Sequence, residues 1–196
     1  MAAAAVLRRG GLVAYPTETF YGLGVLARDG AAVARLVRAK GRPDGKPLPL
    51  VAADRSQVEE VAVLSPLAAR LADALWPGPL TLVLTARPGL APEIPAGTGS
   101  VGVRIPGSEV ARALARAAGG AIVSTSANLA GEAPPARADA LAPALRAGLD
   151  HVLDGGQTPG ERPSTVVVVD GETVRLVRDG AISFGTVLAC LRAPAP

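Results

Sequence analysis

The sequence contains few of the side chains on which disulfides, metal centres and nucleophilic triads depend. Its 196 residues include one cysteine, Cys190, and one histidine, His151. A single cysteine excludes a disulfide within the chain and a zinc site built from several cysteines. A single histidine excludes a His-rich zinc site, and a Ser-His-Asp triad would depend on His151 alone. We therefore expect both residues to be structural.

Long apolar runs are also missing, and aromatic residues make up only 3% of the chain. Without an uncharged apolar run of about 20 residues, no transmembrane helix is predicted. The apolar part of residues 1–9 is too short for a signal peptide, and its arginines follow the apolar part instead of preceding it. We expect a cytoplasmic protein with no membrane contact.

Lysine is the third scarce residue type. The chain has 20 basic residues, of which 18 are arginine, and its two lysines, Lys40 and Lys46, lie in one loop. An ammonium is a compact point charge that an arginine fork does not always replace, so the loop is a candidate binding segment. The net charge of +3 favours polyanionic partners such as RNA or nucleotides without deciding between them.

The order of predicted elements indicates the fold class. Apolar strand patterns at 12–14, 48–52, 80–85, 100–105, 121–123 and 151–153 are interspersed with helical patterns at 2–9, 29–38, 54–61, 65–76, 108–119, 137–145 and 183–191. A hairpin is predicted for 165–177 across Asp170-Gly171. We predict a single α/β domain over residues 1–196, with helices packed on a twisted sheet of parallel and antiparallel strands and a tail at 193–196.

Polar residues gather where the predicted strands end. They are Thr17 and Thr19, the cationic loop 40–46, Ser100 with Arg104, the turn 124–128, Ser164-Thr165, and Arg178. The chain has no P-loop string and no G-x-G-x-x-G after a strand, so neither standard nucleotide motif is indicated. A sheet that brings strand ends together would form a cation- and hydroxyl-rich cleft, suited to a carboxylate and a phosphate chain.

Each of these features also has a purely structural interpretation. The stretch 15–24 carries three of the five aromatic residues, whose rings could simply pack in the core. The loop 40–46 could be a solvated surface, and the turn 124–128 could be held by its own hydroxyl and amide groups. Arg104 is harder to explain in this way, because a buried arginine needs an ion-pair partner or a ligand.

Taken together, the motifs resemble those of the YrdC-like threonylcarbamoyl-AMP synthase family. Tyr15–Gly24 resembles the family's P-T-E-T-x-Y-G-L-G signature, and six further motifs follow in the family's order: 40–48, 76–81, 103–106, 124–128, 163–166 and 178–181. The resemblance covers about residues 10–184, and the chain resembles the short form without an extra C-terminal domain. Phe20 stands where valine is more usual, and Asp179 stands where proline is common.

The resemblance implies a function and a set of partners. Family members make L-threonylcarbamoyl-AMP and pyrophosphate from L-threonine, bicarbonate and ATP, for the threonylcarbamoyl modification at A37 of tRNA. Mg²⁺ is implied together with ATP, while its protein ligands stay open. Further implied partners are tRNA or double-stranded RNA and the proteins that use the labile product.

The resemblance also implies roles for individual residues. Thr19, Arg104, Ser124 and Ser164 would hold threonine. The nucleotide would be held by Lys40, Arg42, Lys46, Ser100, Ser126, Pro134 and Arg178, with Arg42 and Lys46 also catalytic. Glu18 would have a structural role beside Thr19. Two alternatives stay open at this point: an RNA-binding module of the same fold without catalysis, and a paralogue that acts on another small metabolite.

Overall fold

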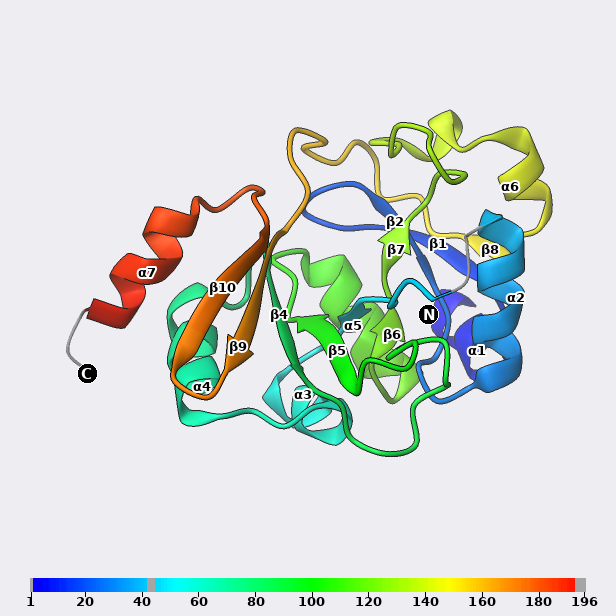
Figure 1. Ribbon diagram of the computed structural model, residues 1–196. Coiled ribbons are helices and arrows are strands. Elements are labelled where there is room, and N and C mark those ends of the chain that lie inside the picture. Colours follow the sequence, from blue (N-terminus) through cyan, green and yellow to red (C-terminus); the bar gives the residue numbers. More distant parts are fainter. Residues whose placement is uncertain (1, 42–44, 193–196) are drawn as a thin grey trace.

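The strands form two hydrogen-bonded sheets that lie side by side (Figure 1). The computed structural model describes residues 2–41 and 45–192. The larger sheet has the strand order β10-β9-β4-β5-β3-β6 and the smaller sheet β7-β2-β1-β8. Each sheet mixes parallel and antiparallel pairs, and helices pack against both. The predicted mixed α/β class is therefore confirmed, with the strands divided between two sheets.

The elements have the following bounds. The helices are α1 (Ala2–Arg8), α2 (Gly30–Lys40), α3 (Arg55–Val61), α4 (Pro66–Leu75), α5 (Glu109–Ala118), the short 3₁₀ helix η1 (Ala138–Ala140), α6 (Pro143–Ala147) and α7 (Phe184–Arg192). The strands are β1 (Val13–Pro16), β2 (Tyr21–Gly24), β3 (Leu50–Val51), β4 (Leu80–Thr85), β5 (Ser100–Arg104), β6 (Ile122–Val123), β7 (Thr125–Ser126), β8 (His151–Val152), β9 (Thr165–Asp170) and β10 (Thr173–Arg178).

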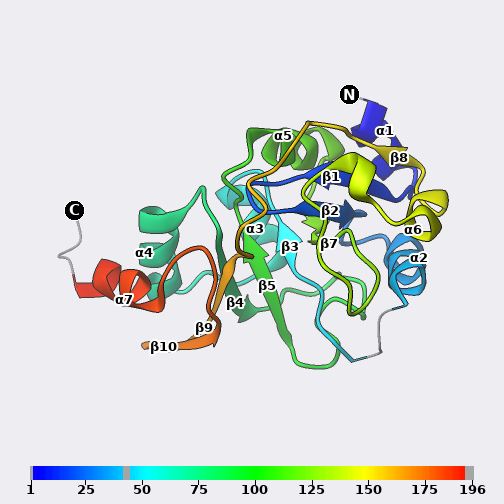
Figure 2. The same ribbon diagram turned by 90° about the horizontal axis from the view of Figure 1, so that it is seen from above.

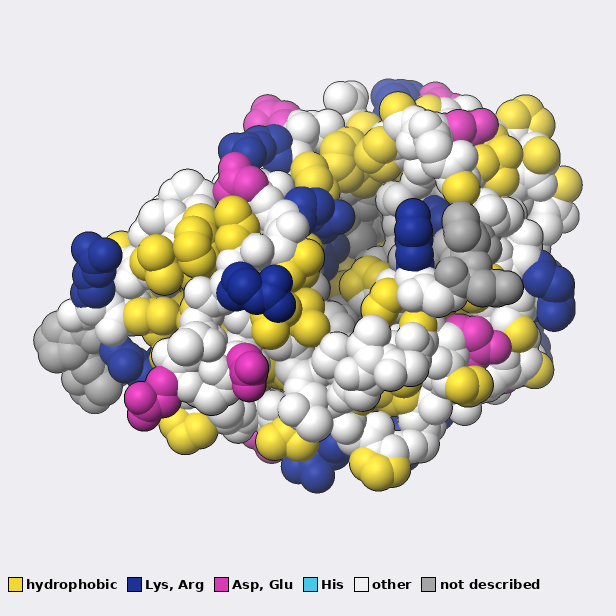
Figure 3. Space-filling model, viewed as in Figure 1, with side chains coloured by type: hydrophobic (Ala, Val, Ile, Leu, Met, Phe, Trp, Pro, Cys, Tyr) yellow, Lys and Arg dark blue, Asp and Glu magenta, His cyan; other side chains and the backbone are white. Residues whose placement is uncertain are grey.

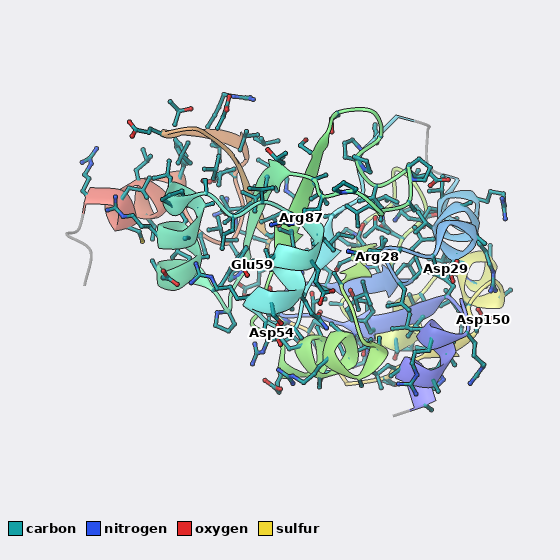
Figure 4. All side chains as sticks on the ribbon, turned by 90° about the horizontal axis from the view of Figure 1, so that it is seen from below. Arg28, Asp29, Asp54, Glu59, Arg87 and Asp150 are labelled. Atoms are coloured by element: carbon teal, nitrogen blue, oxygen red, sulfur yellow. The ribbon has the colours of Figure 1, made fainter. Side chains whose placement is uncertain are left out.

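Side-chain caps start the helices where the sequence predicts them. Asp29 accepts a hydrogen bond from the Ala32 N–H (3.0 Å) and begins α2, and Asp54 accepts from the Gln57 N–H (3.2 Å) and begins α3 (Figure 4). In the predicted capping box the Gln57 side chain would accept from the N–H of Asp54. It accepts instead from Ala53, one residue earlier, at 2.8 Å.

One predicted helix is wrong. The pattern at 137–145 predicts a continuous helix, whereas the chain forms η1, then two extended residues, then α6. Pro143 is the reason, because its ring fixes its own φ and disfavours a helical conformation at Ala142. Proline suits the first helical position, and α6 begins there.

One short backbone segment belongs to both sheets. β6 pairs with β3 in the larger sheet, and β7, two residues later, pairs with β2 in the smaller one. Ser124 lies between the two strands, and its N–H donates to the carbonyl oxygen of Pro49 at 2.8 Å. The main hydrophobic core contains side chains from both sheets, including Leu23 of β2 and Leu82 of β4. The relative position of the sheets is thus set by backbone pairing and by a shared core.

Helices cover one side of this arrangement. α1 and α5 lie behind the sheets in the view of Figure 1, as the view from above shows (Figure 2). Their buried side chains, among them Leu7 and Leu114, pack with Val13 of β1 and Val51 of β3 in a second core. Loops lie on the opposite side, which faces the viewer in Figure 1.

Asp150 connects three parts of the chain near the start of β1. Its Oδ2 accepts from the backbone N–H of the fully buried Leu12 (2.7 Å) and from the Arg35 guanidinium of α2 (2.6 Å). Arg35 also donates to the carbonyl oxygen of Gly148 (2.9 Å). The hydrogen bond from Arg35, followed by that from Leu12, keeps the pKa of the Asp150 carboxyl below its usual value.

Replacing Asp150 with alanine should lower the free energy of unfolding by roughly 1–2 kcal/mol, mainly because the buried Leu12 N–H loses its acceptor. The partly exposed ion pair adds little to this. The folded state lowers the pKa of the Asp150 carboxyl, so it favours the ionised form. The stability that the Asp150 carboxylate contributes is therefore complete above the ordinary carboxyl pKa of about 3.9. It is lost as the pH falls through the lowered pKa of the folded state. Urea unfolding at pH 7 measures the effect. Asp139→Ala, which removes an exposed ion pair with Arg137, is the control and should change the free energy of unfolding far less.

Candidate functional site

The strand directions bring several polar chain ends to one edge of the larger sheet. β5 runs antiparallel to β4 and ends at Arg104, while β4 begins near the same place because Val103 pairs with Leu82. β9 runs parallel to β4, so it also begins there, and β10 returns antiparallel to β9 and ends at Arg178. Arg104, Arg178 and the first residues of β4 and β9 therefore lie at the same edge of the larger sheet.

A cleft of about 690 Å³ opens at this edge. Figure 3 shows a hollow on this face, with Lys and Arg side chains on its flanks. The polar side chains of the lining are Thr17, Thr19, Thr81, Ser100, Arg104, Ser124, Thr125, Ser126, Asn128, Glu132, Ser164 and Arg178. Its apolar wall includes Phe20, Val83, Val166, Val168 and Val177. The smaller sheet supplies one side of the cleft and the larger sheet the other.

Most of the sequence-predicted site residues lie together here. Eight of the eleven line the cleft: Thr19, Ser100, Arg104, Ser124, Ser126, Pro134, Ser164 and Arg178. Lys40 and Lys46 are not part of the lining, and Lys46 is exposed. Arg42 falls outside the described residues. The roles that the resemblance implies for these residues stay predictions, while their convergence is a property of the fold.

Lys40 is buried beside the cleft, with 4% of its surface exposed. Its ammonium donates to the backbone carbonyl oxygens of Ser126 and Asn128, the latter at 2.8 Å. It thereby fixes the turn that carries Ser126 into the cleft. Its direct contact with a nucleotide stays a prediction.

Thr17 and Thr19 form a small hydroxyl pair in the turn before β2. The Thr17 hydroxyl donates to the carbonyl oxygen of Phe20 at 2.8 Å, and the two threonine hydroxyls lie 3.0 Å apart. A hydroxyl has one proton, so Thr17 must accept in this second contact and Thr19 must donate. The lone pairs of Thr19 then remain as acceptors for an N–H or O–H group of a ligand.

Arg104 is the buried cation of the cleft. Its guanidinium donates through Nη1 to Oε1 of Glu18, and the side chains are 8% and 17% exposed. The ion-pair interpretation of Arg104 is therefore confirmed. Arginine carries five N–H donors, so one bond to Glu18 does not exhaust its capacity to bind a carboxylate.

A second polar group surrounds Ser164. Its hydroxyl lies 2.9 Å from that of Thr81, and Arg178 donates both to this hydroxyl (3.1 Å) and to the Ser164 carbonyl oxygen (2.9 Å). The guanidinium of Arg178 is turned inward, although the residue as a whole is exposed. Burial, and secondarily the charge of Arg104, lowers the pKa of Arg178. Two cations facing one cleft favour an anionic ligand.

The first motif positions an aromatic ring behind these groups. Tyr15 is fully buried, and its hydroxyl donates to the Val123 carbonyl oxygen at 3.4 Å. Burial raises its pKa far above the usual tyrosine value, so it stays neutral. A Cβ on Gly24 would lie only 2.8 Å from the ring, so only glycine fits opposite it. Tyr15 thus belongs to the core, as the structural interpretation of this stretch expected.

The part of the chain that the structure describes contains neither a metal-binding cluster nor a membrane-spanning helix. Across residues 2–41 and 45–192, no three His, Cys, Asp or Glu side chains come together in a group that could hold a metal ion. None of the helices in these ranges is long and apolar enough to cross a membrane.

The site and fold have close counterparts among known proteins. The Sua5/YciO/YrdC family profile, described as "Telomere recombination", matches residues 5–180. The chain belongs to this family. The threonylcarbamoyl-AMP synthase of Thiobacillus denitrificans is 42% identical over 83% of this chain and 87% of its own length. The Bacillus subtilis protein of the same name is 40% identical over 92% of this chain.

The structural comparison agrees with the sequence comparison. The crystal structure of P. abyssi Sua5 complexed with L-threonine superposes with a TM-score of 0.92 and 37% identity, over 97% of this chain. The chain spans 56% of that protein and 53% of the B. subtilis relative. The expected single domain of the short form stays a prediction.

The family motif at 178–181 has a structural explanation in this chain. A Cβ on Gly180 would lie 2.4–2.5 Å from backbone atoms of Pro163, Ser164 and Thr165. The Ala181 N–H donates to the carbonyl oxygen of Pro163 at 2.9 Å. The motifs at the two ends of the β9–β10 hairpin therefore meet backbone to backbone, and glycine allows this approach.

The two departures from the family pattern can also be located. Asp179 pairs with Arg162 at 2.8 Å on the surface, so its charge has a partner other than Arg178. The ring of Phe20 lines the cleft, and its Cε1 lies 3.8 Å from the Cβ position of Gly160. This larger side chain therefore faces the 155–163 loop.

Sequence reasoning overlooked some of the lining. Thr81, which contacts Ser164, and the valines Val166 and Val168 were not predicted as site residues. Thr81 is the last residue of the proline- and glycine-containing motif 76–81, near the start of β4, and the two valines alternate along β9. Residues i and i+2 of a strand lie on the same face of the sheet. Where a strand begins at a site motif, this alternation can therefore predict which of its side chains line the cleft.

Replacing Gly180 with alanine should destabilise the protein by about 1–3 kcal/mol, because backbone atoms at 163–165 must move to admit the methyl group. Gly185→Ala, near the start of α7, is the matched control. Its added Cβ would meet nothing closer than 3.7 Å, so stability should be unchanged or slightly higher. Urea unfolding compares the two, and equal stability of both variants would contradict the close approach.

Proposed function

We propose that this chain is an L-threonylcarbamoyladenylate synthase, a nucleotidyltransferase that makes threonylcarbamoyl-AMP and pyrophosphate from L-threonine, bicarbonate and ATP. The observation that carries the proposal is one cleft that joins two cations, Arg104 and Arg178, to the hydroxyls of Thr19, Ser124 and Ser164. Curated relatives that are named threonylcarbamoyl-AMP synthase, and a related structure bound to L-threonine, support it.

In this proposal the threonine lies at the buried end of the cleft. Its carboxylate pairs with the N–H groups of Arg104 that face the cleft. The oxygen of the Thr19 hydroxyl accepts a hydrogen bond from the amine or the hydroxyl of the substrate. Ser124 and Ser164, from the junction of the sheets and the start of β9, supply the remaining hydrogen bonds.

The nucleotide lies toward the open side. We assign the nucleotide to Ser100, Ser126, Pro134 and Arg178, which line the cleft, and its phosphates to Arg42 and Lys46. The exposed Lys46 suits this role, because an ammonium on a flexible stem can follow a phosphate chain. Lys40 supports the same part of the site through the Ser126 turn.

The chemistry depends on position and charge. The neutral amine adds to bicarbonate and water leaves, which gives a carbamate. A carbamate oxygen then forms a bond to the α-phosphorus of ATP, and the bond between that phosphorus and pyrophosphate breaks. Such a transfer needs in-line alignment and neutralisation of the phosphates more than a general base. A cation-rich cleft without a triad is consistent with this.

Magnesium enters the reaction as part of the ATP substrate. Mg²⁺ commonly binds substrate phosphates and keeps several waters, so it needs few protein ligands. The described residues offer no acidic cluster, which fits arrival as Mg-ATP. The labile product would pass to a protein that transfers it to tRNA. We accordingly propose a cytoplasmic location, where ATP, bicarbonate and tRNA occur together.

Pyrophosphate release should require threonine and bicarbonate at once. The purified chain is incubated with Mg-ATP, bicarbonate and one amino acid at a time, and pyrophosphate is measured with a coupled assay. Serine is the control, because it keeps the carboxylate, amine and hydroxyl but lacks the methyl group. Release that is equally fast with serine, or no release at all, would contradict the proposed function.

Thr19→Val should raise the KM for threonine about tenfold, since the substrate loses one acceptor in a buried site. Thr19→Ser keeps the hydroxyl and should stay within about threefold of the wild type. Steady-state kinetics at saturating ATP distinguish the two variants. If valine and serine have equal effects, the hydroxyl is not the group that binds threonine.

A further inference from the structure

The Glu18–Arg104 pair differs from the other ion pairs of the described chain. Both of its side chains are less than one-fifth exposed, whereas every other pair in residues 2–41 and 45–192 has a partner that is at least 38% exposed. A buried ion pair is weak evidence for stability, because removing two charges from water costs about as much as their attraction returns. Stability alone therefore does not explain the buried Glu18–Arg104 pair.

Glu18 approaches Arg104 from outside the cleft. Thr17, Thr19 and Arg104 all line the cleft, but Glu18 is not part of the lining. Its Cβ and Cγ lie within 3.6 Å of the position that a Cβ on Gly107 would occupy, in the turn after β5. The carboxylate therefore binds the guanidinium from the side of this turn and does not occupy the space available to a ligand.

The second oxygen of Glu18 is unsatisfied. Oε2 is buried and has no hydrogen-bond partner among the described residues. A carboxylate with one oxygen unpaired is costly to bury, so Arg104 is what compensates it. The dependence within the pair is therefore unequal. Glu18 needs Arg104 to compensate its buried charge, whereas Arg104 has further N–H donors for a ligand.

Resting on the function proposed above, we propose that Glu18 is a positioning residue that fixes the guanidinium of Arg104 for the carboxylate of threonine. A long arginine side chain loses much rotamer freedom when it binds a ligand, and a prior bond to Glu18 removes that cost in advance. Glu18 also offsets one of the two positive charges, Arg104 and Arg178, that line the cleft.

Glu18→Gln tests this with almost no change of shape. We expect the KM for threonine to rise about tenfold, because the guanidinium loses its fixed orientation, while the KM for ATP stays within twofold. Asp73→Asn is the matched control, since it removes one negative charge from an exposed pair between Asp73 of α4 and Arg55 of α3, neither of which lines the cleft. It should leave both KM values unchanged.

Two further variants separate positioning from a structural role. In an Arg104→Lys background, Glu18→Gln should change the threonine KM by less than twofold, because the group that it positions is absent. Glu18→Asp keeps the charge on a shorter stem and should fall between wild type and Glu18→Gln. It also serves if Glu18→Gln folds poorly, which melting curves of all variants record.

The outcomes are decisive. An unchanged or lowered threonine KM in Glu18→Gln, equal rises for threonine and ATP, or full additivity with Arg104→Lys would overturn the role of Glu18. Calorimetric binding of L-threonine to the wild-type chain without ATP tests the premise separately. If the wild type neither binds threonine nor releases pyrophosphate, the proposed function fails, and this inference fails with it.

Discussion

The cleft depends on one constraint, the passage of the backbone from the larger sheet to the smaller one through β6 and β7. Because β6 pairs with β3 and β7 pairs with β2, the sheets cannot shift relative to each other without breaking backbone hydrogen bonds. Ser124 lies at the crossing, and it lines the cleft together with Thr19 and Arg104. The ammonium of Lys40 also stabilises this segment, because it donates to the backbone carbonyl oxygen of Ser126. Polar groups from distant parts of the chain therefore face a common space.

The polar groups of the cleft each make some, but not all, of their possible hydrogen bonds within the protein. Thr17 uses the hydroxyl proton of Thr19, Ser164 shares contacts with Arg178, and Glu18 takes one donor of Arg104. Each group is oriented by the protein and keeps capacity for a ligand. Such preorganisation lowers the entropy lost on binding and places charge where phosphates and carboxylates would lie. The lowered pKa of Arg178 reflects first the burial of its guanidinium and second the nearby charge of Arg104.

Much of the architecture could be predicted because its signals are local. An aspartate before an amphipathic pattern favours a helix start, and Asp29 and Asp54 begin α2 and α3 in this way. The hairpin at 165–177 follows from its turn residues. The helix predicted at 137–145 was wrong for an equally local reason, since the effect of Pro143 outweighed the apolar pattern. The division of strands between two sheets was not predictable in this way, because strand partners are chosen by contacts across the whole chain.

By itself, the sequence determined which chemical groups are available and which motifs carry them: an arginine-rich chain with hydroxyls at strand ends, and glycines where the backbone packs closely. It could not show that Glu18, next to Thr19, turns away from the cleft to bind Arg104, which lies 86 positions away. Nor could it show that Lys40 is buried against backbone carbonyls. Side-chain direction and burial depend on which segments pack together, and only the tertiary structure decides that.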